Sequence, residues 1–233
     1  MRQKTVSGGW AQALRAAFPV TIPVLTGFTC LGLAYGLLMQ SRGYGPFWST
    51  LISLVCYCGS MQYAAIPLLA AGFDPLQALL LSVMVNARHM FYGLSLLEKY
   101  RGLGTARLPL IYTLTDETFS LISTVEPPEG VDRKQFYLSV SLLNYAYWAA
   151  ATLAGGLLGS LLTLDLTGID FALTALFVVL FLEQWKKREN RPAGVIGLVC
   201  AAAALALFHD DLVIPAMVLI LAVLTGGRKH LCA

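Results

Sequence analysis

Polar and ionisable side chains gather near the end of a long apolar stretch in the first half of the sequence. Asn86, Arg88 and His89 follow an uncharged run that extends from residue 75 to residue 85. An arginine at the centre of a membrane span costs at least about 2.5–3.5 kcal/mol on insertion scales, so an ionisable group at that depth usually faces the protein interior and serves a function. We therefore expect this cluster to belong to a site inside a membrane.

A second polar cluster, Thr115-Asp116-Glu117, interrupts another apolar stretch and supplies the opposite charge. Thr115 suits a helix N-cap, because its hydroxyl can accept a hydrogen bond from a backbone N–H group of the first turn. Asp116 and Glu117 would then lie in that first turn, where the positive end of the helix favours carboxylates. The cluster therefore predicts a helix that begins in the middle of an apolar stretch.

Together the two clusters have the chemistry to bind a small zwitterion, whose charges must both be paired in a low-dielectric site. Arg88 could hold a carboxylate through two hydrogen bonds. Asp116 or Glu117 could accept an ammonium group or carry a coupling proton, and His89 is a candidate proton relay beside them. Neutral hydrogen bonds could come from Gln62, Asn86 and Thr115.

Structural roles remain open for the same residues. Arg88 could form an ion pair with Asp116 or Glu117 that only fixes helix packing, or its head group could extend to the membrane interface. For His89, a packed and hydrogen-bonded position is the more common role. Gln62 could instead hold membrane helices together, as polar residues often do.

The composition is that of an integral membrane protein. The chain has 233 residues, of which 57% are hydrophobic and 12% are charged, and its mean hydropathy is +0.69. This is too apolar for a soluble domain, whose surface must carry charge. The net charge of +3 lies mostly in loops, where it orients the chain, so it does not indicate a nucleic-acid partner. Lipid is the expected surrounding.

The apolar pattern predicts an all-α fold with six to eight transmembrane segments, because each span needs about 20 residues. We interpret residues 1–233 as a single integral membrane domain in which residues 1–17 form a cytoplasmic tail. The candidate segments are 18–39, 46–70, 75–97, 107–124, 136–163, 169–185, 193–208 and 212–227.

Two of these segments, 46–70 and 107–124, are expected to be broken or re-entrant. The first contains Gly59 and Ser60 and then Pro67, and the second contains the threonines around Asp116, so helix propensity falls at both centres. Irregular backbone at membrane depth is tolerated only where protein or a wet cavity covers it, and discontinuous helices near the midplane commonly form transport sites.

The distribution of lysine and arginine favours re-entry, since cations concentrate in cytoplasmic loops. If all eight segments cross, the loop that contains Lys99, Arg101 and Arg107 lies outside. If 46–70 and 107–124 enter and leave on one side, this loop becomes cytoplasmic and Arg42 is the remaining outer cation. Both arrangements place both termini in the cytoplasm.

An ordered set of short motifs resembles the AzlC/YgaZ family over nearly the whole chain. Ala87 stands where a bulkier aliphatic residue is expected, which leaves Arg88 in place but alters the packing beside it. The motifs are Phe18-Pro19 with Gly27, Gly32 and Gly36, Gly59-Ser60-Met61-Gln62-Tyr63, Asn86-Ala87-Arg88-His89-Met90-Phe91-Tyr92, Thr115-Asp116-Glu117-Thr118-Phe119 and Gly168-Ile169-Asp170-Phe171.

The resemblance implies the large subunit of an exporter of branched-chain amino acids (valine, leucine and isoleucine) in the bacterial cytoplasmic (inner) membrane. It also implies a small, separately encoded membrane partner of the AzlD/YgaH type, and no cofactor. The alternatives are a channel, a structural membrane subunit, or an intramembrane enzyme that uses His89 with Asp116 and Glu117. The enzyme is disfavoured because the chain has no metal-binding helix signature and no nucleophile elbow.

Overall fold

The computed structural model describes residues 9–71, 74–161 and 191–208, and in addition residues 171, 178, 181–182, 185–186, 188 and 219. Within these residues the secondary structure is helical and contains no strand, which confirms the predicted all-α class. The chain forms two compact units, Met1–Asp74 with Val85–Leu166 and Pro75–Met84 with Thr167–Ala233. The single domain expected from the sequence stays a prediction.

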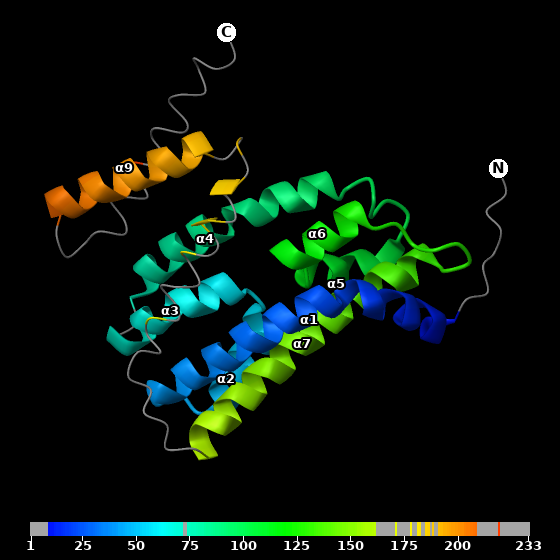
Figure 1. Ribbon diagram of the computed structural model, residues 1–233, viewed down its shortest axis with the longest axis horizontal. Coiled ribbons are helices and arrows are strands. Elements are labelled where there is room, and N and C mark those ends of the chain that lie inside the picture. Colours follow the sequence, from blue (N-terminus) through cyan, green and yellow to red (C-terminus); the bar gives the residue numbers. More distant parts are fainter. Residues whose placement is uncertain are drawn as a thin grey trace, which may run out of the picture. The chain divides into compact units, whose positions relative to one another are not determined.

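Two long helices form the centre of the first unit (Figure 1). They are α1, Trp10–Ser41, and α7, Arg133–Leu161. They run parallel to each other, because Gly32 lies against Ala151 and Gly36 lies against Thr152 and Gly155. α1 begins at Trp10, within the stretch that the sequence predicted as a tail, and it passes through Pro19 and Pro23.

Glycines allow the close approach of these two helices. A Cβ atom on Gly36 would collide with the backbone of Thr152, Gly155 and Gly156, and a Cβ atom on Gly155 would collide with the backbone of Leu33. Small residues four apart on facing helices are the usual basis of tight packing in membranes. Gly32 and Gly36 therefore allow α1 to pack closely against α7. Among the described residues, no atom lies within 4 Å of the Cβ position of Gly27, so this glycine takes no part in the α1–α7 contact.

The predicted segment 46–70 is a hairpin of two short helices. α2 is Pro46–Cys56 and α3 is Gly59–Ala71. α2 runs antiparallel to α7, since Pro46 lies against Gly156 whereas Leu54 accepts a hydrogen bond from Tyr145. α3 then returns, because the Tyr44 hydroxyl, just before α2, donates to the Leu69 carbonyl near the end of α3 at 2.9 Å.

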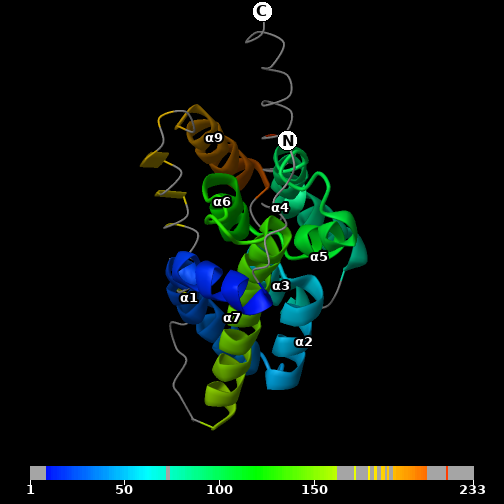
Figure 2. The same cartoon turned by 90° about the vertical axis from the view of Figure 1, so that its right-hand side faces the viewer.

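The predicted segment 107–124 forms a second hairpin at the other end of α7. After the 3-10 turn η1, Gly104–Ala106, it consists of α5, Arg107–Tyr112, and α6, Asp116–Thr124. Its two ends are packed together by a buried apolar cluster that includes Leu103, Leu110, Ile122 and Phe136. Figure 2 shows α5 and α6 beside the half of α7 that begins at Arg133, and α2 and α3 beside the half that ends at Leu161.

Lys99 binds the C-terminal end of α6, where the second hairpin ends. Its Nζ atom donates to the carbonyls of Ile122 at 2.9 Å and Ser123 at 3.0 Å, where the negative end of α6 favours a cation. The same atom lies 2.7 Å from a carboxylate oxygen of Glu126. This hydrogen bond, together with the Lys99 charge, lowers the pKa of Glu126 below its ordinary value. The hairpin therefore returns to the loop from which it started.

The remaining described helices are α4, Pro75–Ser95, and α9, Arg191–Phe208. Among the described residues, α1 is the one helix that is both long and apolar enough to cross a membrane by length and composition, while parts of α2, α4 and α9 form shorter apolar helices. The number of spans stays a prediction, because segments 169–185 and 212–227 lie largely outside the described residues. α4 and α9 correspond to the predicted segments 75–97 and 193–208.

Candidate functional site

The tip of the first hairpin is the break between α2 and α3. Tyr57 ends α2 in a left-handed conformation, with φ 38° and ψ 48°, and it is the one non-glycine residue with positive φ in the described part of the chain. Such a conformation is costly for a residue with a side chain and persists only where the surroundings hold it. Tyr57 is also almost fully buried, with 4% of its surface exposed.

The break leaves carbonyl groups at the end of α2 without helical partners, and two tyrosines supply donors. The Tyr112 hydroxyl donates to the carbonyls of Leu54 at 2.6 Å and Val55 at 2.8 Å. The Tyr145 hydroxyl donates to the same Leu54 carbonyl at 2.7 Å. The last carbonyls of any helix need such partners when water is excluded. The end of α2 is thus stabilised by two tyrosine hydroxyls, although Leu54, Val55 and Tyr112 are themselves exposed on the surface of the unit.

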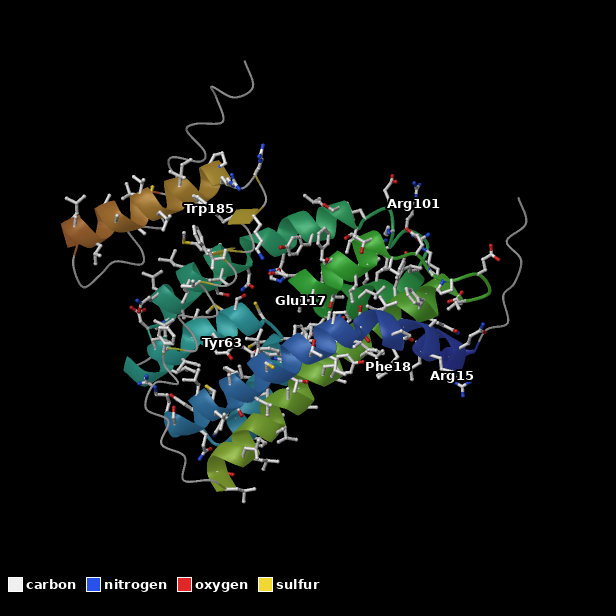
Figure 3. All side chains as sticks on the ribbon, in the orientation of Figure 1. Arg15, Phe18, Tyr63, Arg101, Glu117 and Trp185 are labelled. Carbon is white, nitrogen blue, oxygen red and sulfur yellow. The ribbon has the colours of Figure 1, made fainter. Side chains whose placement is uncertain are left out.

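The tip of the second hairpin is the break between α5 and α6. Thr115 caps α6 and accepts a hydrogen bond from the Thr118 backbone N–H at 3.3 Å, with Asp116 and Glu117 in the first turn. The N-cap and the position of both carboxylates are therefore confirmed. Figure 3 shows Glu117 at the beginning of α6.

The two tips meet beside the middle of α7. The Tyr57 hydroxyl faces the hydroxyls of Thr118 and Thr115, and the Glu117 carboxyl lies within electrostatic range of it. From α7, Asn144 donates through Nδ2 to the Thr118 hydroxyl at 3.0 Å. A left-handed residue of one hairpin and the capped helix start of the other therefore form one buried junction.

α4 brings two further predicted residues to this region. The Cys58 thiol, next to Tyr57, donates to Oδ1 of Asn86 at 2.9 Å. The His89 ring makes an edge contact with the Tyr92 ring at 5.6 Å, and Tyr92 stacks on Phe119 of α6 at 4.4 Å. Asn86 thus contacts the first tip, and His89 is linked to α6 through aromatic rings.

Gln62 lies in a separate buried network that joins α3 to α2 and α7. Its Nε2 atom donates to the Ser53 hydroxyl at 2.8 Å, and its Oε1 atom accepts from the Trp148 indole N–H at 2.8 Å. Ser53 in turn donates to Thr152 at 3.0 Å. The amide of Gln62 thus uses both of its polar atoms in contacts with its own chain.

The other predicted site residues have different positions. A Cβ atom on Gly59 would come within 3.0 Å of the Trp148 ring, so this glycine allows close packing at the start of α3. The Ser60 hydroxyl lies 3.8 Å from the Cys58 sulfur. The side chain of Arg88 lies outside the described part of the structure, although its backbone belongs to α4.

The structure thus gathers Asn86, Thr115 and Glu117 around the two tips, and it places Gln62 in packing contacts. The roles of all predicted site residues stay predictions. Sequence reasoning missed the residues that join the tips to each other and to α7. Their signal was weak, because isolated polar residues in apolar helices also serve packing. The missed residues are Tyr57, Thr118, Asn144, Tyr112, Tyr145 and Trp148.

Comparisons with known proteins agree on one family. A family model described as "AzlC protein" matches residues 23–162. The "Branched-chain amino acid transport protein AzlC" of Bacillus subtilis (strain 168) is 45% identical over 223 residues, which cover 95% of this chain and 87% of that protein. Residues 23–162 contain both hairpins, the whole of α7 and the part of α1 from Pro23 onward.

More distant relatives are also named as membrane proteins. An "Uncharacterized membrane protein" of Helicobacter pylori (strain ATCC 700392 / 26695) is 40% identical and covers 94% of this chain and 97% of its own length. The "Inner membrane protein YgaZ" of Escherichia coli (strain K12) is 25% identical over 79% of this chain and 75% of that protein. No solved structure matches this chain significantly.

Proposed function

This chain belongs to the AzlC family, and from that premise we propose that it is the large subunit of a transporter for branched-chain amino acids. The proposal places it in the bacterial cytoplasmic membrane, with both termini in the cytoplasm, and assigns it export coupled to protons. It also assigns a small membrane partner of the AzlD/YgaH type, which would cover polar and broken backbone at membrane depth.

The observation that carries the proposal is the meeting of two helix breaks near the middle of α7. Tyr57 at one tip faces Thr115 and Thr118 at the other. Each hairpin starts and ends at its own end of α7, so the two tips approach the junction from opposite ends of that helix. Two opposed hairpins around a central site are what alternating access requires, since either side can open while the other stays closed.

The chemistry at the junction supports a zwitterionic substrate. Asp116 and Glu117 supply negative charge for the ammonium group or for a coupling proton. Arg88 belongs to α4, the helix that contacts the first tip through Asn86. Arg88 is assigned to the carboxylate, because a guanidinium group can bind it through two parallel hydrogen bonds. Apolar side chains around the junction suit an aliphatic substrate.

Counterflow in proteoliposomes tests the proposal. Vesicles that contain the full chain, with or without the small partner, are loaded with unlabelled leucine and diluted into trace labelled valine. We expect transient accumulation of unchanged valine inside, which saturates with concentration and is larger when the partner is present. Protein-free vesicles are the control. Linear flux without accumulation would indicate a channel, chemically altered substrate would indicate an enzyme, and no flux in either preparation would contradict the proposal.

A further inference from the structure

Two buried polar atoms at the junction of the hairpins have unused hydrogen-bonding capacity. The Tyr57 hydroxyl lies near the Thr118 and Thr115 hydroxyls, but within the described residues neither it nor Oδ1 of Asn144 has a partner in regular hydrogen-bond geometry. Only 4% of Tyr57 and 0% of Asn144 is exposed. Both residues lie near Thr118, Tyr57 at the end of α2 and Asn144 in α7. Buried polar groups are nearly always satisfied in folded proteins, so an unused pair at one place indicates a missing partner.

Several oxygen atoms of the described residues lie near these two atoms. They comprise the hydroxyls of Tyr57, Thr115 and Thr118 and the amide oxygen of Asn144, with the Glu117 carboxyl within electrostatic range of Tyr57. An amide oxygen can only accept hydrogen bonds, and the same is true of a carboxylate when it is ionised. The first-turn carboxylates Asp116 and Glu117 also offset the positive end of α6, so these oxygens suit a cationic group.

We propose that Tyr57, Thr118 and Asn144 form, together with Glu117, a subsite for a compact monovalent cationic group at the junction of the two hairpins. The group is the α-ammonium of the substrate or a coupling cation such as sodium, which share the need for converging oxygens. The inference deepens the proposed function and rests on it for the identity of the substrate. It adds Tyr57 and Asn144, which lie outside the sequence motifs, and it gives a binding role to Thr118, which lies within one of them.

Ligand-induced thermal stabilisation of the full chain in detergent tests the subsite. The probes are leucine, its amine analogue 3-methylbutylamine, its acid analogue 4-methylpentanoate, and sodium chloride against choline chloride. For an ammonium subsite, Asn144→Leu and Tyr57→Phe should weaken leucine and 3-methylbutylamine at least tenfold and leave 4-methylpentanoate unchanged. For an ion subsite, the same variants should lose stabilisation by sodium while leucine measured in choline stays unchanged.

Tyr63→Phe is the matched control for the loss of a buried tyrosine hydroxyl. Tyr63 lies in α3 next to α1 (Figure 3), and its hydroxyl donates to the Leu31 carbonyl at 2.6 Å. We expect this variant to lose stability but to keep the affinity for every probe. If Asn144→Leu does not fold, Tyr57→Phe and Asn144→Asp decide the matter, and Asn144→Asp should strengthen cation binding because it adds a carboxylate.

The subsite is overturned if folded variants at positions 57 and 144 bind leucine, 3-methylbutylamine and sodium as the parent chain does. Failure of the proposed function gives a different pattern. In that case leucine does not stabilise the parent chain, while sodium or the amine still does so in a manner that depends on Asn144. If no probe stabilises the parent chain, both the subsite and the proposed function are contradicted.

Discussion

Gln62 and Asn144 are both buried amides, and their surroundings assign them opposite roles. The Gln62 amide uses its oxygen for Trp148 and its nitrogen for Ser53. The Asn144 amide uses only its nitrogen, for Thr118. A side chain whose polar atoms are all engaged in its own chain has little left to offer a ligand, so this comparison favours a structural role for Gln62 and a binding role for Asn144.

Gln62→Leu should therefore destabilise the protein without changing substrate affinity. The substitution leaves the Trp148 N–H buried without its acceptor, which costs about 1–3 kcal/mol of unfolding free energy. Denaturant titration in detergent micelles measures this loss, with the exposed Gln12→Leu as the control that should change it by less than about 0.5 kcal/mol. An unchanged stability together with a large drop in leucine affinity would instead make Gln62 a substrate ligand.

Arg88→Lys separates substrate binding from structural pairing. Lysine keeps the charge but not the planar fork, so the variant should insert and assemble normally and yet transport poorly if Arg88 binds a carboxylate. A structural pair behaves differently, because removing one partner costs about 3–5 kcal/mol and removing both restores folding. Arg88→Met with Glu117→Gln tests that restoration. Parental flux and leucine-induced stabilisation in Arg88→Lys would exclude the carboxylate role.

The sequence predicted the helix breaks in segments 46–70 and 107–124, but not which residues contact them. Low helix propensity around Gly59 and the capping pattern at Thr115 are local signals, and both helices begin where these signals predict. The meeting of Tyr57 with Thr118 is set by how two hairpins dock on α7. That docking depends on contacts between residues far apart in the chain, which no local pattern encodes.

The α1–α7 contact depends on the absence of side chains at particular glycines. Gly36→Ala should lower the unfolding free energy by about 1–3 kcal/mol, because the added methyl group meets the α7 backbone and forces the helices apart. Gly27→Ala on the same helix is the matched control, since no described residue lies within 4 Å of its Cβ position, and it should be neutral or stabilising by up to about 1 kcal/mol. Equal effects at both positions would contradict this account.

The end of α2 depends on two tyrosine hydroxyls that share one carbonyl. Tyr112→Phe and Tyr145→Phe should each cost about 0.5–1.5 kcal/mol, the usual net value of a hydrogen bond. The double variant should cost more than the sum, because the Leu54 carbonyl then loses both donors. A double-mutant cycle in micelles measures the coupling. Strict additivity would mean that water already reaches this helix end.

The positions of the arginines in the first unit indicate which end of the α1–α7 pair faces the cytoplasm. In the first unit Arg15 and Arg101 lie at the same end of the α1–α7 pair (Figure 3), and Arg133 begins α7 at that end. Arg42 follows α1 at the opposite end. Because cytoplasmic loops are rich in cations, the end at which α7 begins is expected to face the cytoplasm. Asn144, at the junction of the hairpins, then lies about 16 Å along α7 from Arg133, at 1.5 Å per residue, or about two fifths of the length of the helix.

Cysteine labelling from each side of the membrane tests this topology. In a variant without native cysteines, Ser41→Cys and Thr105→Cys are small changes at exposed positions just before each hairpin. If both hairpins re-enter, an impermeant reagent should label position 41 only from outside and position 105 only from the cytoplasm. If segments 46–70 and 107–124 cross completely, both positions lie outside. Labelling of position 105 from outside would therefore contradict the arrangement of two opposed hairpins. The proposed transport depends on that arrangement, because it requires access to the junction from both sides of the membrane.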